Sequence, residues 1–215
     1  MKGLVISGDY WHPSATVEQG LQFLQGQGWD LTFLREMEHI QLSTYDFAAY
    51  EAIFVCKDNR NSYEDDGQWL TEAVATRFTE YVKAGGCLMV MHAGSVAPKS
   101  SPLFKELVGC EFDMHPEQCP VKYFPVGNAV FTDDISEFTE QDEHYKIDIS
   151  ATDIQVFLSS TSEYFDEVAG YYRNVGSGKV VVLTPGHNLP VWLHPEYQKL
   201  IANALVAYAN QPKRL

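Results

Sequence analysis

Short, uninterrupted apolar runs that alternate with helical periods constrain this chain more than any other feature. A strand that is apolar at every position has both faces buried, which is typical of a parallel sheet covered by helices. The segments between the runs carry apolar residues at helical spacing, from Ser14 to about Gly26 and from about Trp69 to Ala84. The first half therefore predicts a doubly wound α/β sheet whose strands are Gly3–Ser7, Leu31–Leu34, Ala52–Cys56 and Cys87–Met91.

The second half is richer in strand signals. Val121–Val126 and Ile154–Ser159 are predicted strands. Ala169–Asn174 and Lys179–Thr184 flank the turn Gly176-Ser177-Gly178, which predicts an antiparallel hairpin. A last helix is predicted from about Glu196 to Ala209, with Pro195 at its start. We expect a single domain over residues 1–215, with a mostly parallel sheet that this C-terminal hairpin extends.

The charge of the chain restricts its partners. It carries 15 Lys and Arg against 29 Asp and Glu, a net charge of −14 with histidine neutral. Such a surface repels phosphate backbones and anionic lipids, which disfavours nucleic acid and membranes as partners. The apolar runs are too short to cross a bilayer, and the N-terminus lacks the pattern of a signal peptide. We expect a cytoplasmic protein whose thiols Cys56 and Cys87 are buried and unpaired, and a homo-oligomer remains open.

Histidines follow three of the predicted parallel strands. His12 lies in the loop after the first strand, His92 directly after the fourth, and His187 after the last. Ligands of open parallel sheets bind outside the carboxyl ends of the strands. Any one of these histidines could be an ordinary hydrogen-bonded loop or core residue, but three at the same rim favour a shared polar site.

A dense polar cluster, Gln141-Asp142-Glu143-His144-Tyr145, adds a carboxylate candidate. Glu143 could serve as a general acid or base or as a metal ligand, while the plain alternative is a solvated acidic loop. The chain has no G-x-G-x-x-G, no P-loop and no G-x-S-x-G motif. Nucleotide cradles of these kinds and a hydrolase nucleophile elbow are therefore unsupported.

Three stretches together carry a family resemblance. They are VGSGKVVVLTPGH (residues 175–187, followed by Trp192 and Pro195), GGCLMVMHA (residues 85–93) and DEHY (residues 142–145), with a looser match at GDYWHP (residues 8–13). Together they resemble the ThuA-like (trehalose utilisation) family of the class I glutamine amidotransferase-like superfamily, over nearly the whole chain. One departure is Gly127-Asn128-Ala129-Val130, which stands where many members carry a His-Pro pair.

The resemblance implies a flavodoxin-like fold and a role in sugar metabolism. Amidotransferase relatives place a nucleophilic cysteine in a tight elbow after the equivalent central strand. Here that strand ends in Met91-His92-Ala93, and Cys87 lies inside the strand. A thiol there lacks the exposure of an elbow nucleophile, so a glutaminase is not expected.

Two functions are consistent with the sequence. The first is an enzyme that acts on a sugar or keto-sugar derivative with His92, His187 and Glu143 as catalytic residues, since imidazoles suit proton transfer near neutral pH. The same residues with His12 could instead hold a divalent metal such as zinc. The second is a non-catalytic sugar-binding or regulatory module. The substrate-binding candidates in either case are His12, Tyr10, Trp11, Tyr145 and Trp192.

Overall fold

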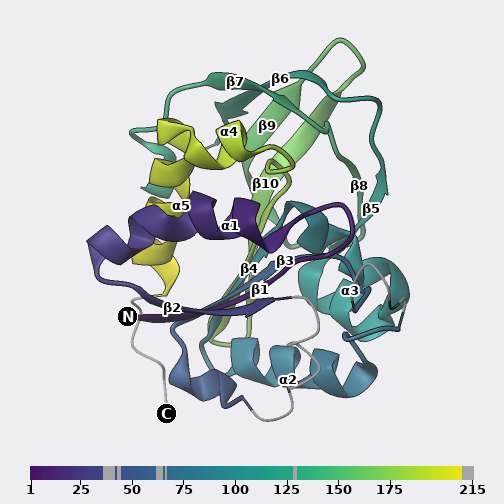
Figure 1. The fold of residues 1–215 in the computed structure, drawn as a ribbon, viewed down its shortest axis with the longest axis vertical. Helices are drawn as coiled ribbons and strands as arrows, with labels where there is room; N and C mark the ends of the chain where they lie inside the picture. Colours follow the sequence, from purple (N-terminus) through teal and green to yellow (C-terminus); the bar gives the residue numbers. More distant parts are fainter. Residues whose placement is uncertain (36–41, 43–44, 62–64, 66, 128–129, 210–215) are drawn as a thin grey trace.

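A mixed sheet with helices on both faces forms the centre of the protein (Figure 1). The structure, a computed structural model, describes residues 1–35, 42, 45–61, 65, 67–127 and 130–209. In these residues the sheet has nine strands in the order β2-β1-β3-β4-β11-β10-β9-β6-β7. The α/β fold class that the apolar runs predict is confirmed.

One half of the sheet is parallel and contains all five of the predicted apolar runs. Every residue of β3 and β4 is buried, as two-sided coverage requires. The expected antiparallel hairpin is also present, because β11 pairs with β10 on one side and with β4 on the other. The parallel strands are β1 (Lys2–Ser7), β2 (Asp30–Arg35), β3 (Ala52–Cys56), β4 (Cys87–Met91) and β11 (Gly178–Leu183).

The antiparallel half is larger than a single hairpin. Beyond β10 (Asp166–Val175) it continues through β9 (Gln155–Thr161) and β6 (Cys119–Pro125) to the edge strand β7 (Phe138–Asp142). A separate antiparallel pair joins β5 (Cys110–Met114) to β8 (Lys146–Ile149). None of β5, β7 and β8 is predicted from the sequence, since polar residues interrupt each of them and no continuous apolar run marks them.

The helices divide between the two faces of the sheet (Figure 1). On one face α1 (Ser14–Leu21), α4 (Leu189–Leu193) and α5 (Pro195–Tyr208) enclose a core that contains Leu21, Trp192 and Leu200. On the other face α2 (Glu72–Lys83) and α3 (Pro102–Val108) enclose a core that contains Phe78 and Phe104. The sheet therefore has no broad solvent-facing side in its parallel half.

Helices α1 and α2 differ in how their N-termini are capped. Thr71 caps α2, because its hydroxyl accepts a hydrogen bond from the backbone N–H of Val74 at 3.3 Å. Ser14, where the predicted helical period begins, does not cap α1. Pro13 occupies the cap position without a side-chain hydrogen bond, and Ser14 is already the first helical residue. The helix passes into a 3₁₀ turn, Gln22–Gln27, and ends at Gly28 with φ of 84°.

The cysteines are as expected. Cys56 and Cys87 are buried free thiols, and so are Cys110 and Cys119. Burial raises the pKa of the Cys87 thiol to about 12, so it stays protonated at neutral pH. In the described part of the chain, no helix combines the length and apolar character that crossing a membrane demands.

Candidate metal centre

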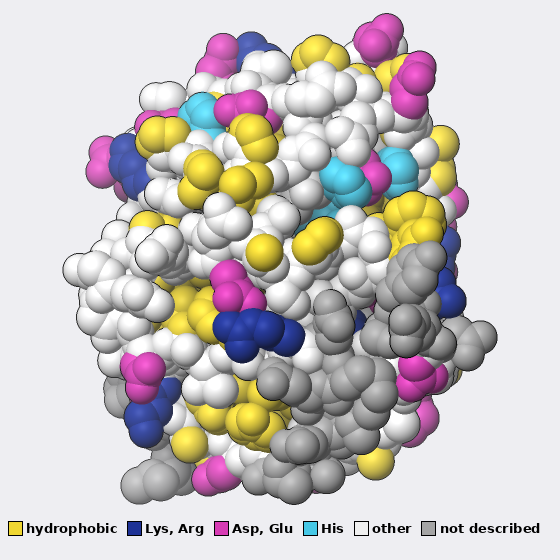
Figure 2. All heavy atoms as spheres, viewed as in Figure 1, with side chains coloured by type: hydrophobic (Ala, Val, Ile, Leu, Met, Phe, Trp, Pro, Cys, Tyr) yellow, Lys and Arg dark blue, Asp and Glu magenta, His cyan; other side chains and the backbone are white. Residues whose placement is uncertain are grey.

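Four side chains from distant parts of the chain converge at the carboxyl end of the parallel strands. His12, His92, Glu143 and His187 each offer one ligand atom, and these atoms all lie within 4.8 Å of one another. Glu143 Oε2 is central, 3.1 Å from His187 Nδ1, 3.5 Å from His92 Nε2 and 4.0 Å from His12 Nε2. Figure 2 shows histidine side chains beside an acidic one on the surface of this region.

The topology explains the convergence. His12 follows β1, His92 follows β4 and His187 follows β11, and these parallel strands present their carboxyl ends at one edge. Glu143 arrives from the other half of the sheet, on the connection between β7 and β8. The structure therefore brings together the four residues that the sequence nominates as candidate ligands.

His92 has an unusual backbone conformation. Its φ is 44°, and it is the one non-glycine residue with positive φ in the described part of the chain. This region costs an ordinary residue about 1–2 kcal/mol, and such strain is found most often at functional sites. Gly94 completes the turn, because a Cβ there would lie 2.0 Å from the carbonyl oxygen of Val55. His92 thus stands in a strained, tightly packed turn directly after β4.

Hydrogen bonds to neighbouring groups orient two of the imidazole rings. His92 Nδ1 lies 2.8 Å from the backbone oxygen of Thr184. A carbonyl oxygen only accepts, so Nδ1 carries the hydrogen and the Nε2 lone pair faces the cluster. His12 Nδ1 contacts Asp9 Oδ1 at 2.8 Å, and this contact leaves His12 Nε2 facing the cluster as well. Histidines that bind metals are oriented by partners of this kind.

The backbone near His187 is held by a buried carboxylate. Asp142 accepts hydrogen bonds from the N–H groups of Gly186 and His187, each at 2.9 Å, and from the Tyr123 hydroxyl at 2.8 Å. Asp142 is fully buried, so these three donors are what stabilise its charge. Asp142, the last residue of β7 and the neighbour of Glu143, therefore connects the end of β7 to the turn after β11.

The electrostatics of the cluster are dominated by Glu143. Burial raises the pKa of this carboxyl, but contacts with His187 and His92 outweigh that effect and hold it well below its usual value. Burial lowers the pKa of His92, so its imidazole tends to be neutral. Burial also lowers the pKa of His187, but the adjacent Glu143 carboxylate more than compensates and the pKa is raised. Glu143 is thus an anion that faces imidazole nitrogens.

The donor set fits a divalent cation. His12 Nε2, His92 Nε2, Glu143 Oε2 and His187 Nδ1 are buried and have no hydrogen-bond partner among the described residues. Leaving a buried polar atom unpaired costs about 1–3 kcal/mol, so four together call for a ligand. Three imidazoles and one carboxylate are donors that Zn²⁺ and similar ions accept.

A cavity of about 370 Å³ opens beside the cluster. Its volume suits a small molecule. Trp11, at its mouth, is 64% exposed, while Tyr145 is buried and stacks on His92 with ring centroids 4.1 Å apart. The cavity is lined by Trp11, His12, Asp58, Val96, Phe112, His115, Glu143 and Tyr145.

Two ionisable lining residues, Asp58 and His115, are not among the sequence candidates. Asp58 directly follows β3, so the strand-end rule that finds the histidines also points to it. His115 has no such signal, because β5 belongs to the separate two-stranded sheet. Its Nε2 lies 3.6 Å from Glu143 Oε1, and its ring stacks on Tyr145 at 5.6 Å.

Two aromatic candidates lie elsewhere. Trp192 is only 1% exposed, packs against Gly20 and donates its indole N–H to the backbone oxygen of Gly186 at 2.6 Å. It is a core residue beneath the turn that carries His187 and has no face free for a sugar. Tyr10 is half-buried and packs edge-on against Trp11 at 4.2 Å rather than lining the cavity. The segment Gly127-Asn128-Ala129-Val130 departs from the family pattern, and its residues Asn128 and Ala129 lie outside the described part of the chain.

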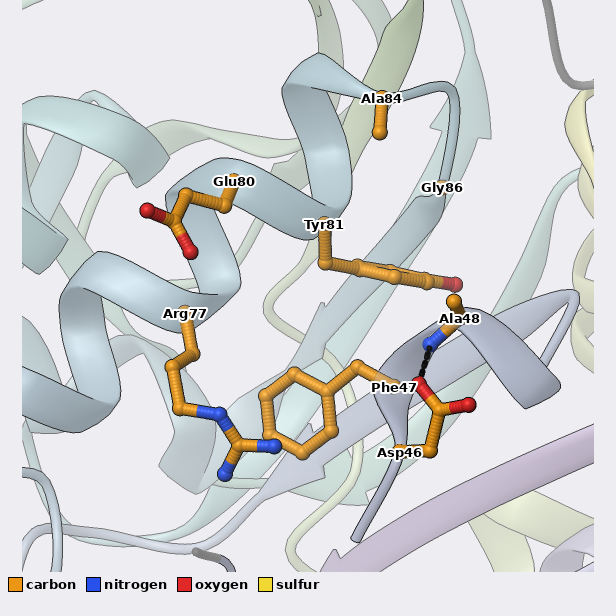
Figure 3. Close-up of a pocket in the computed structure, with 8 residues that line it drawn as sticks. All are labelled: Asp46, Phe47, Ala48, Arg77, Glu80, Tyr81, Ala84 and Gly86. Atoms are coloured by element: carbon orange, nitrogen blue, oxygen red, sulfur yellow. Dashed lines mark hydrogen bonds between the residues drawn. The ribbon is translucent and has the colours of Figure 1, made fainter. Parts of the chain in front are cut away.

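A second cavity, of about 280 Å³, lies away from the cluster, beside α2 and the 3₁₀ turn Phe47–Ala49 (Figure 3). Arg77 packs over the Phe47 ring and donates to the backbone oxygens of Leu42 and Tyr45. Tyr81 donates to the backbone oxygens of Glu51 and Cys87. Arg77 and Tyr81 thus stabilise the fold through these contacts. Among the described residues, those that line this cavity do not form a group of metal ligands like the one around Glu143.

Comparison with known proteins identifies the family. The family model for ThuA, described as trehalose utilisation, matches residues 2–209. The chain belongs to the ThuA family. A search of the curated proteins finds no match to the sequence.

Solved structures share the ThuA-family fold. A ThuA-like protein from Parabacteroides merdae superposes with a TM-score of 0.81 at 16% identity, covering 100% of this chain and 92% of that chain. A cytoplasmic protein from Salmonella typhimurium LT2 gives 0.71 at 14% identity, with 97% and 99% covered. A β-galactosidase from Rahnella sp. R3 gives 0.68 at 12% identity, covering 95% of this chain but 31% of that chain. At these identities the likeness shows the fold alone.

Proposed function

We propose that this ThuA-family chain is an enzyme that acts on a sugar or keto-sugar derivative with the help of a divalent metal ion. His12, His92, Glu143 and His187 would hold the ion. The observation that carries the proposal is the convergence of four buried, unpartnered ligand atoms within 4.8 Å. The family description, trehalose utilisation, supports a sugar as the substrate class.

The residues of the chain have separable tasks in this proposal. A bound ion would polarise a carbonyl or hydroxyl oxygen of the substrate. Asp9 and the Thr184 carbonyl keep the His12 and His92 rings oriented. Trp11 offers an exposed aromatic face to the apolar face of a sugar ring at the cavity mouth.

The surroundings agree with a small neutral ligand. The net charge of −14 disfavours nucleic acid and anionic membranes as partners. The Salmonella protein with this fold is described as cytoplasmic, which supports the same location for this chain.

The metal proposal is tested by elemental analysis and by a matched pair of variants. Glu143→Gln removes the central charge with little change in shape, and Glu140→Gln makes the same change on β7, away from the cavity lining. We expect Glu143→Gln to weaken zinc binding by more than about 100-fold, since even the outer partners of metal ligands contribute about 10–100-fold. Glu140→Gln should bind zinc like the wild type. Equal zinc affinity in all three proteins would contradict the proposal.

Catalysis is tested with trehalose, glucose and keto-sugars in D₂O, followed by proton NMR. An enzyme of this kind would cleave a bond or exchange a C–H hydrogen next to a carbonyl, and both change the spectrum. The exposed Trp11 also suits a non-catalytic sugar-binding module. That alternative predicts sugar-dependent thermal stabilisation with an unchanged spectrum.

A further inference from the structure

Asp58 is a carboxylate of the cavity that does not belong to the metal cluster. It directly follows β3 and lines the cavity together with Glu143 and His12. Of the residues that line the cavity in the described part of the chain, Asp58 and Glu143 carry carboxylates. Glu143 Oε2 faces the imidazoles, so Asp58 is the carboxylate of this cavity lining that does not belong to the cluster and can contact a ligand.

Three hydrogen bonds hold Asp58 in place. Its backbone N–H donates to Asp9 Oδ2 at 2.9 Å, and its backbone oxygen accepts from the Trp69 indole at 2.6 Å. Its side-chain Oδ1 accepts from the backbone N–H of Arg60 at 2.9 Å. Among the described residues Oδ2 has no hydrogen-bond partner, so one oxygen is fixed and the other is available. A preorganised group of this kind loses little entropy when it contacts a ligand.

Asp9 couples Asp58 to the cluster. One Asp9 oxygen contacts His12 Nδ1 at 2.8 Å, and the other accepts from the Asp58 backbone. Asp9 therefore holds the His12 imidazole and the backbone of Asp58 in fixed positions relative to each other. A ligand that fills this cavity would meet both Asp58 and His12, because both line it.

The surroundings of Asp58 suit proton exchange. Burial and the nearby Asp9 carboxylate raise the pKa of Asp58, and the backbone N–H of Arg60, Lys57 and His12 offset this only in part. Lys57 is buried and donates to the backbone oxygen of Asn61 at 3.0 Å. A carboxyl whose pKa lies nearer to neutral is a better proton donor and acceptor at cellular pH.

We infer that Asp58 is a catalytic residue that exchanges a proton with a substrate oxygen on the side of the cavity facing the cluster. As a base, the carboxylate takes the proton of a substrate hydroxyl; the O–H bond of the substrate breaks and a carboxylic O–H bond forms. The reverse transfer returns the proton to a substrate oxygen, so no oxidant or reductant is needed. This inference rests on the proposed function.

The test compares Asp58→Asn with Asp148→Asn, an exposed aspartate on β8 outside the cavity lining. The asparagine keeps the shape and the contact with Arg60 but cannot exchange a proton. We expect Asp58→Asn to keep the zinc content and zinc-induced stabilisation of the wild type while kcat falls about 10²–10⁴-fold. The pH profile of kcat should lose one limb. Asp148→Asn should match the wild type throughout.

Three outcomes separate the possibilities. Unchanged kcat in Asp58→Asn overturns the inference, with the proposed function intact. Loss of zinc together with kcat also overturns it, because Asp58 would then act through the metal cluster. A wild type that binds zinc but leaves trehalose, glucose and the keto-sugars unchanged contradicts the proposed function, and the inference fails with it.

Discussion

At the scale of single residues, His144 shows how far burial changes a group that the sequence places in a polar cluster. Its two ring nitrogens contact the hydroxyls of Ser162 and Ser160, each at 2.8 Å, and its ring stacks on Phe165. Burial lowers the pKa of His144 to about 4 from an ordinary 6.5. The imidazole is therefore neutral in the folded protein above about pH 4.

His144 makes stability depend on pH. Between about pH 6.5 and pH 4 the unfolded chain binds a proton that the folded protein does not, so stability is full above this window and falls as the pH decreases through it. We expect the wild type to lose about 1 kcal/mol more than His144→Gln between pH 7 and pH 5, after allowing for solvent screening. Urea unfolding with a chelator present measures this. Equal losses in the two proteins would show that His144 does not titrate as described.

At the scale of elements, the turn between β10 and β11 shows why the hairpin sits close to α2. A Cβ on Gly178 would lie 2.1 Å from the backbone oxygen of Val82 and 2.4 Å from that of Gly86. Both contacts are with backbone, which cannot move aside without shifting the end of α2. The glycine therefore sets how closely helix and hairpin pack.

Gly178→Ala should destabilise the protein by about 2–4 kcal/mol, in the range of severe packing defects. Gly26→Ala is its control, because nothing lies within 4 Å of a Cβ there. The control should change stability by less than about 1 kcal/mol. Both variants should still bind zinc, since Gly178 lies at the opposite end of β11 from His187. Similar unfolding midpoints for the two variants would mean that the hairpin tolerates a side chain.

At the scale of the whole molecule, the proposed metal joins the two halves of the sheet. Three of its ligands follow parallel strands, and Glu143 follows β7 at the antiparallel edge. An ion that binds only the folded protein stabilises it by about 2.7 kcal/mol at 100 times its Kd. Binding of the ion should therefore stabilise, at the same time, loops that are far apart in the sequence.

We expect zinc at that concentration to raise the Tm by about 5–10 °C, and a chelator to reverse the rise. Hydrogen exchange should slow together in the loops after β1, β4, β7 and β11. Helix α2, which borders the second cavity, is the internal control and should change little. Protection confined to one loop would contradict a shared site and indicate surface binding.

The sequence predicts the parts of this protein that depend on local pattern. Five largely apolar runs identify the parallel strands. Burial on both faces leaves little room for polar residues in β1, β3, β4 and β11, while the edge strand β2 is mostly half-buried. The strand-end rule places His12, His92 and His187 at one rim, and it would also have found Asp58. It could not find His115, because β5 is short, mixed in polarity and outside the main sheet. The same limit hides β7 and β8, where polar and apolar residues mix.

Residue type and order alone thus determined the parallel strands, the helices between them and the histidines at the ends of these strands, since each depends on near neighbours in the chain. Tertiary structure alone decided the rest. It brought Glu143 from the antiparallel edge to the histidines, buried Trp192 in the core, and placed Asp58 in the cavity that His12 and Glu143 also line. These outcomes depend on which distant segments share the available space and which polar atoms find partners once water is excluded.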